Sequence, residues 1–199
     1  MTRGLQWRVF VLQVGLIGIL GFVAGFAFWG SNFATSQVHD QLSAQRVFFP
    51  AAGTAALTSL PAADAAAMSV YAGEQMTTGP QAETYADHFI AVHLGEIAGG
   101  KTYSEVSAAS IADPTNTKLA GQVQTLFRGE TLRGLLLNSY GWWQIGQYAF
   151  YAAIGLAVAT LAVLVTFIVE LFIWRRERQA GATTGFGRDR DSGRRVKVA

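Results

Sequence analysis

The sequence predicts an all-α membrane protein, with two transmembrane helices and a mainly helical extracytoplasmic segment between them. Three observations predict this fold: two uncharged apolar blocks, tryptophans at the ends of both blocks, and basic residues gathered at the two ends of the chain. Only 14% of the 199 residues are charged, against about 25% in an average soluble domain. The absence of cysteine excludes disulfides and thiolate metal sites.

Residues 1–8 form the predicted cytoplasmic N-terminus, and residues 9–30 form the first transmembrane helix. At 1.5 Å per residue this uncharged block reaches about 33 Å, which is enough to cross a hydrocarbon core of about 30 Å. A cleaved signal peptide is the alternative, with a small-x-small site at Gly25 and Ala27. Because the apolar run exceeds the usual signal-peptide length and ends at Trp29, we expect a retained signal anchor.

Residues 31–147 form the predicted extracytoplasmic segment. The first helix is expected to continue beyond the membrane and to end near residues 48–50, where a proline follows two phenylalanines. Residues 51–80 are rich in alanine and predict a connector that contains a short helix.

The helices that follow the connector have clear start and stop signals. A helix that begins near Glu83 should end at Gly99-Gly100, since glycine favours the left-handed conformation after a helix. Thr102 and Glu105 form a capping-box sequence, which predicts the start of the next helix. Asp113-Pro114 should break that helix, and a long helix should start near residue 117 and lead into the second span.

Residues 148–174 form the second predicted transmembrane helix, and residues 175–199 form a basic, disordered cytoplasmic tail. Each tryptophan of the chain lies at the edge of an apolar block, as expected for anchors in the headgroup region. These interface anchors are Trp7, Trp29, Trp142, Trp143 and Trp174.

Charge predicts the orientation. The segment between the spans has a net charge of −4, whereas arginines flank the outer ends of both spans. Basic flanks stay in the cytoplasm, so both termini are predicted to be cytoplasmic. The basic tail calls for no nucleic-acid partner, because such residues are normal beside a span.

Small residues form a stripe on each predicted span. Such stripes allow helices to approach closely, so we expect them to pack on each other or on a partner in the membrane. The helix-packing residues are Gly18, Gly21 and Gly25 on the first helix, and Ala149, Ala153 and Ala157 on the second.

No convincing catalytic or cofactor-binding motif is present. Nucleophile-elbow, Ser-x-x-Lys and phosphate-loop patterns are missing from the sequence. His39, His93 and Glu96 are candidate metal ligands, but His93 and Glu96 lie three residues apart, a spacing that is common by chance. We therefore predict no catalytic residue, no metal and no cofactor, and we keep a metal-dependent extracytoplasmic enzyme as the less favoured alternative.

The stretch TYADHFIAVHLGEIAGGKTYSEVSA, followed by LRGLLLNSYGWWQIGQYAFYAAIG, resembles a group of uncharacterised actinobacterial membrane proteins with two spans and an H…GGKTY-type core. The resemblance implies a bacterial plasma-membrane location and a two-pass topology. Some members carry the label of aromatic-ring-opening dioxygenase, which would require iron held by histidines and a carboxylate. Nothing in this chain supplies such a set.

These features favour a non-enzymatic membrane protein, an accessory, scaffold or assembly factor that binds another envelope protein or a second copy of itself. An envelope sensor with an extracytoplasmic ligand-binding segment is the alternative from another class. A sensor needs a folded cytoplasmic output domain, and a tail of 25 residues is a poor candidate for one.

Overall fold

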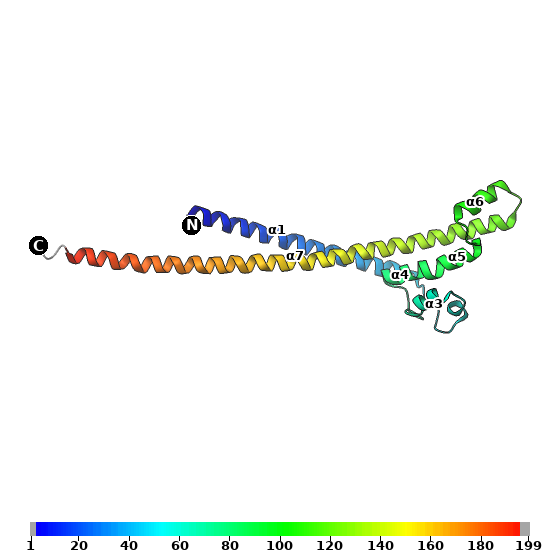
Figure 1. Cartoon of the computed structure of the whole chain (residues 1–199), viewed down its shortest axis with the longest axis horizontal. Helices are drawn as coiled ribbons and strands as arrows, with labels where there is room; N and C mark the ends of the chain where they lie inside the picture. Colours follow the sequence, from blue (N-terminus) through cyan, green and yellow to red (C-terminus); the bar gives the residue numbers. More distant parts are fainter. Residues whose placement is uncertain (1–2, 196–199) are drawn as a thin grey trace. The chain divides into compact units, whose positions relative to one another are not determined.

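The computed structural model describes the backbone of residues 3–195 and the side chains of residues 4–179 (Figure 1). The described chain is helical and contains no β-strand, apart from a single antiparallel bridge between Phe48 and Gln75. Its elements are α1 (Arg3–Gln45), α2 (Ala55–Thr58), α3 (Ala62–Ser69), α4 (Gly79–Tyr85), the π-helix η1 (Ala86–Ile90), α5 (Ala91–Ala98), α6 (Tyr103–Ala112) and α7 (Thr117–Arg195).

The chain divides into two compact units. The terminal unit consists of Met1–Ala27 and Tyr151–Ala199, and the central unit is Phe28–Phe150. Two helices are long and apolar enough to cross a membrane, Gly4–Gln45 and Thr117–Gln179, with mean hydropathies of 2.3 and 2.6 in their most apolar windows. Only 6% of each window is buried within the protein, which leaves most of these apolar side chains without a covering partner in the chain.

In the terminal unit α1 and α7 pack antiparallel along a regular seam. The less exposed residues recur at alternating steps of three and four, the spacing of a left-handed coiled coil. Gln13 Nε2 donates to Glu170 Oε2 across the seam at 3.0 Å, and the ring of Phe10 meets the ring of Phe167 edge-on at 5.7 Å. The seam residues are Gln13, Ile17, Leu20, Ala24 and Ala27 on α1, with Ala153, Leu156, Thr160, Val163, Phe167 and Glu170 on α7.

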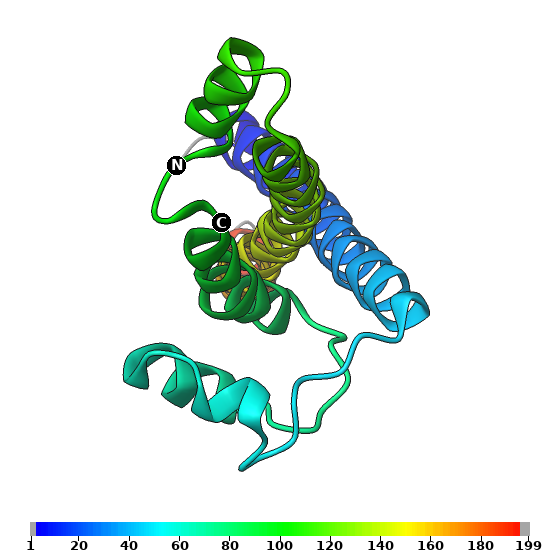
Figure 2. The same cartoon turned by 90° about the vertical axis from the view of Figure 1, so that its right-hand side faces the viewer.

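The central unit has one continuous hydrophobic core, to which every one of its helices contributes. Figure 2 shows α2 and α3 (cyan) set off by loops between the end of α1 and α4. Methionines and branched side chains fill this core, and they come from α1, α3, α6, α7 and the loop before α4. The largest fully buried side chains are Leu42, Met68, Met76, Val106, Leu126 and Leu136.

Close approaches in the central unit depend on glycine. A Cβ added at Gly79 of α4 would lie 2.4 Å from Cβ of Trp143 on α7, and one added at Gly129 of α7 would lie 2.3 Å from Cδ2 of Leu94. Because glycine has no Cβ, Gly79 and Gly129 let α4 and α5 pack closely on α7.

The local stop and start signals are confirmed after residue 98. Gly99 is left-handed, with φ +60°, and Gly100 N–H donates to Gly95 O at 2.8 Å, which satisfies a carbonyl at the end of α5. Thr102 and Glu105 form the predicted capping box at the start of α6. The long helix starts at Thr117, as the sequence predicts.

The region around residues 46–80 differs in detail from the prediction. Helix α1 ends at Gln45, before the predicted stop, because Arg46 adopts a left-handed φ of 53°. The chain then runs extended, and Met76 N–H donates to Val47 O at 2.9 Å. Residues 51–80 contain α2 and α3 instead of one short helix.

The backbone of α7 is helical as far as Arg195, whereas the sequence predicts a disordered tail over residues 175–199. The side chains beyond Gln179 lie outside the described residues.

Candidate functional site

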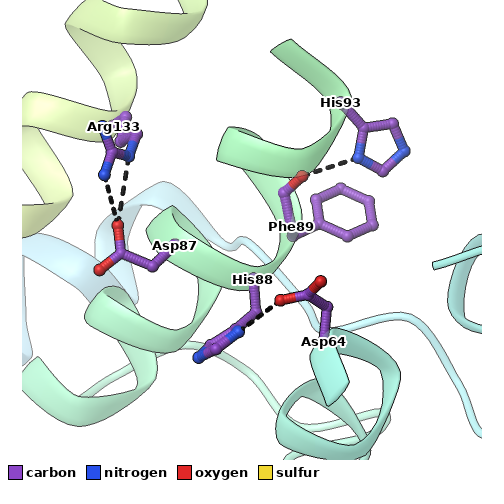
Figure 3. A network of polar contacts seen from close by, with 6 residues as sticks. All are labelled: Asp64, Asp87, His88, Phe89, His93 and Arg133. Carbon is purple, nitrogen blue, oxygen red and sulfur yellow. Dashed lines mark hydrogen bonds and ion pairs between the residues drawn. The ribbon is translucent and has the colours of Figure 1, made fainter. Parts of the chain in front are cut away.

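A polar network that links α3, η1 and α7 surrounds η1 (Figure 3). This π-helix inserts an extra residue into the turn between α4 and α5, and π-turns of this kind are frequent at functional sites. Asp87 and His88, which are neighbours in η1, contact partners on two different helices.

Asp87 accepts two hydrogen bonds from Arg133 of α7 on the same oxygen. Arg133 Nη2 lies 2.7 Å from Asp87 Oδ1, and Nε lies 3.2 Å from it. Glu130, one turn earlier on α7, is 3.6 Å from the same guanidinium. The hydrogen bond to Asp87 raises the pKa of Arg133 above its ordinary value, so the guanidinium keeps its charge.

His88 and His93 make separate contacts. His88 Nδ1 lies 2.7 Å from Asp64 Oδ1, which connects η1 to α3. His93 Nδ1 lies 2.7 Å from the carbonyl oxygen of Phe89 one turn earlier, so Nδ1 is the protonated nitrogen that donates this bond. The imidazole also packs against the Phe89 ring, with the ring centres 4.5 Å apart.

The network is built to hold helices together. Each carboxylate of Asp64 and Asp87 is paired with a side chain from another element, and the network residues include no hydroxyl that could act as a nucleophile. Among the described residues no group of three His, Asp or Glu side chains is placed to hold a metal ion, so His39, His93 and Glu96 do not come together. We assign this network to the packing of α3 and η1 on α7.

A second feature of the central unit is an exposed apolar face on α7, outside the predicted spans. Phe127, Leu135, Trp142 and Ile145 are 57%, 61%, 54% and 55% exposed. At about 100° per residue these four positions lie within roughly 80° of one another around the helix axis. These four residues, which we call the outer face of α7, therefore lie on one side of the helix, with the exposed polar residues Thr131 and Asn138 between them.

A shallow pocket of about 300 Å³ borders the outer face of α7. Trp142 is part of both. The rest of the lining mixes amides with small and aromatic groups: Phe33, Ala34, Gln37, Val38 and Gln41 from α1, and Asn138 and Ser139 from α7. The lining carries no formal charge, so a ligand or partner here would be recognised by apolar contact and by amide hydrogen bonds.

Some of the predicted helix-packing residues lie in the seam between α1 and α7, and others are exposed. Ala153 is buried at 5% exposure, in the seam of the terminal unit. A Cβ at Gly21 would lie 3.8 Å from Cγ2 of Thr160, whereas a Cβ at Gly18 or Gly25 would meet no atom within 4 Å. Gly18 and Gly25 thus face away from α7, and contact with a partner stays a prediction for them. Ala149 is half-buried in the central unit, and Ala157 is exposed.

The predicted anchors are mostly accessible. Trp7, Trp29 and Trp142 are exposed, and Trp143 and Trp174 are half-buried. Trp143 packs on Tyr140, with the ring centres 6.3 Å apart. Their role at a membrane interface stays a prediction.

No family model, curated protein or solved structure matches the chain. The actinobacterial resemblance is therefore an untested prediction. Sequence reasoning did not identify Asp64, Asp87 and Arg133 as interacting residues or Phe127 and Leu135 as surface residues. The Arg133–Asp87 pair spans 46 residues of sequence, so no local spacing could reveal it.

Proposed function

We propose that this chain is a two-pass plasma-membrane protein that acts as an accessory, scaffold or assembly factor. In this proposal the terminal unit crosses the bilayer with both termini in the cytoplasm. The central unit folds at the outer surface of the membrane, where the outer face of α7 binds another envelope protein. The proposal assigns the chain no reaction and no cofactor.

Membrane insertion is supported by the surface of the terminal unit. Its two apolar helices have only 6% of their most apolar windows buried, and in water that much exposed apolar surface would be strongly unfavourable. The net charge of −4 between the spans, against the arginines outside them, supports a cytoplasmic location for both ends.

The observation that carries the partner proposal is the outer face of α7. A single exposed apolar residue is ordinary, but large apolar residues gathered on one exposed face are typical of interaction sites. Four large apolar side chains, each more than half exposed, share one side of α7 beside an uncharged pocket, and Trp142 is at the membrane end of this face. Two of them are aromatic, the residue class that dominates binding energy at protein interfaces.

The exposed glycines of the terminal unit support the same proposal. Gly18 and Gly25 have open space where a side chain would be, and the seam with α7 lies on another face of α1, about 130° away. A transmembrane helix of a partner could pack there at short distance.

The test is purification of the tagged full-length chain in a mild detergent from its native membrane, followed by mass spectrometry of the proteins that stay bound. We expect a stoichiometric membrane partner. Leu135→Glu should release it, because a carboxylate in the centre of an apolar contact loses its hydration. Ile111→Glu is the matched control, since Ile111 on α6 is 76% exposed and lies outside this face.

Recovery of the wild-type chain with no bound protein would overturn the partner proposal. Equal loss of the partner in both glutamate variants would also overturn it, because the effect would then not depend on the outer face of α7. Circular dichroism of both variants checks that each keeps its helical content.

A further inference from the structure

The terminal unit has an apolar pocket on one side of its helix seam. The pocket measures about 360 Å³ and is lined only by apolar and aromatic side chains. Those from α1 are Trp7, Phe10, Val11 and Val14, and those from α7 are Phe167, Leu171 and Trp174.

The wall of this pocket is an aromatic cluster. Phe10 meets Phe167 edge-on at 5.7 Å and Trp174 edge-on at 5.9 Å between ring centres. Because Phe10 comes from α1 and its two partners come from α7, the cluster fixes the distance between the helices at this level. The pocket is therefore a property of the helix pair and not of one mobile side chain.

A positive charge is held at this pocket. The guanidinium of Arg178 lies over the ring of Trp174, 3.9 Å from its centroid, in a cation–π arrangement. At about 100° per residue, Arg178 lies on the same side of Trp174 around α7 as Phe167 and Leu171, which line this pocket. Arg8 follows Trp7 directly in the sequence and is exposed. Both arginines lie on the predicted cytoplasmic side of the spans, where a phospholipid headgroup would be.

Acidic residues line a second pocket, on the other side of the aromatic cluster. This pocket of about 310 Å³ shares Phe10 and Trp174 with the first, but Gln6, Glu170 and Glu177 also line it. An anionic headgroup is disfavoured in this acidic pocket and favoured in the first, where the lining carries no carboxylate and Arg178 stacks on one wall. The two pockets are thus distinguished by charge.

We propose that the first pocket binds one acyl chain of an anionic phospholipid of the cytoplasmic leaflet, with the headgroup phosphate paired to Arg178. This inference rests on the proposed insertion of α1 and α7 into a bilayer and is independent of the envelope partner. The acyl chain covers the half-buried rings of the aromatic wall. Both kinds of headgroup carry the phosphate, but a zwitterionic headgroup also carries a cation that Arg178 repels, so an anionic headgroup is preferred.

The test uses the purified full-length chain in detergent, with phosphatidylglycerol or phosphatidylcholine of identical acyl chains added at equal concentration. Native mass spectrometry measures how much of each lipid stays bound. We expect about fivefold higher retention of phosphatidylglycerol, the preference that one arginine near a headgroup contributes.

Two pairs of variants separate specific binding from general lipid contact. Arg178→Gln should remove most of the preference. Arg176→Gln should leave it unchanged, because Arg176 stacks on Phe172, which is not part of the pocket. Val11→Trp should fill the pocket and reduce retention of both lipids, whereas Leu161→Trp should not, since Leu161 is exposed and lies outside the pocket lining.

Equal retention of the two lipids by the wild-type chain would overturn the inference. Equal losses in the two arginine variants, or in the two tryptophan variants, would also overturn it. Carbonate extraction of native membranes tests insertion separately: release of the chain into the soluble fraction would contradict the two-pass proposal itself. An inserted chain with no lipid preference would contradict only the pocket assignment.

Discussion

Replacement of Gly79 by alanine should force α4 away from α7. The new Cβ would lie 2.4 Å from Cβ of Trp143 and 2.6 Å from its Cγ. The Cβ of Trp143 is fixed to the backbone of α7, so no rotation of the indole ring can relieve the contact. Relief requires a shift of the helix itself, and with it of the buried residues Gln81 and Ala82.

Two opposing effects set the change in the free energy of unfolding that Gly79→Ala causes. Removal of a glycine from a helix stabilises a protein by at most about 1 kcal/mol, through the lower entropy of the unfolded chain. Overpacking of a filled site costs about 1–3 kcal/mol. The contact with Trp143 is far below van der Waals distance, so we expect the upper half of that range. Gly79→Ala should therefore destabilise the chain by about 1–2 kcal/mol.

The assay is thermal unfolding of the full-length chain in one detergent, followed by circular dichroism. The midpoint of Gly79→Ala should fall by about 3–6 °C. Gly141→Ala is the control, because a Cβ at Gly141 on α7 would meet no atom within 4 Å, and its midpoint should stay equal or rise. A Gly79→Ala variant as stable as the wild type would refute the close approach of α4 to α7.

Three further predictions concern the central unit. Hydrogen bonds from Thr102, first from its backbone N–H, lower the pKa of Glu105. The folded form therefore gains stability above the unfolded pKa of this carboxyl and loses it as pH falls through the folded pKa; Glu105→Gln should remove this part of the acid sensitivity in pH-dependent melting curves. A double-mutant cycle of Asp87→Asn and Arg133→Gln should give a coupling of about 0.5–1 kcal/mol, since both side chains are about one-third exposed, and a value near zero would contradict the pairing. Gly99→Ala should destabilise the chain by about 1 kcal/mol, because φ is +60° there; an unchanged melting midpoint would contradict the left-handed end of α5.

The sequence predicted what depends on neighbouring residues. The end of α5 at Gly99 and the capping box of Thr102 and Glu105 use hydrogen bonds within a few residues, so their signals are local. The two apolar helices were also predictable, because length and hydropathy are properties of one continuous block.

What the sequence could not predict depends on residues far apart in the chain. The contact of Gly79 with Trp143 and the pairing of Asp87 with Arg133 join α4 and η1 to α7. The extra residue in η1 leaves no mark on an α-helical periodicity, so the prediction treated residues 83–98 as one regular helix. Because of this extra residue, the neighbours Asp87 and His88 contact partners on two different helices, α7 and α3.

The choice of packing face in the terminal unit shows a third limit. Small residues favour close helix contact in membranes, but α1 has small residues on more than one face. The seam with α7 uses Ala24 and Ala27 with larger neighbours, and Gly18 and Gly25 remain open. A pattern of small residues in one helix does not specify which partner they meet.

The most direct test of the central claim is the topology of the chain in native cells. The chain has no cysteine, so single variants Thr2→Cys, Ser104→Cys and Ser192→Cys each report one position. A membrane-impermeant maleimide should label Ser104→Cys in intact cells, and should label the two terminal variants only after permeabilisation. Labelling of either terminal variant in intact cells, or protection of Ser104→Cys, would contradict the two-pass arrangement.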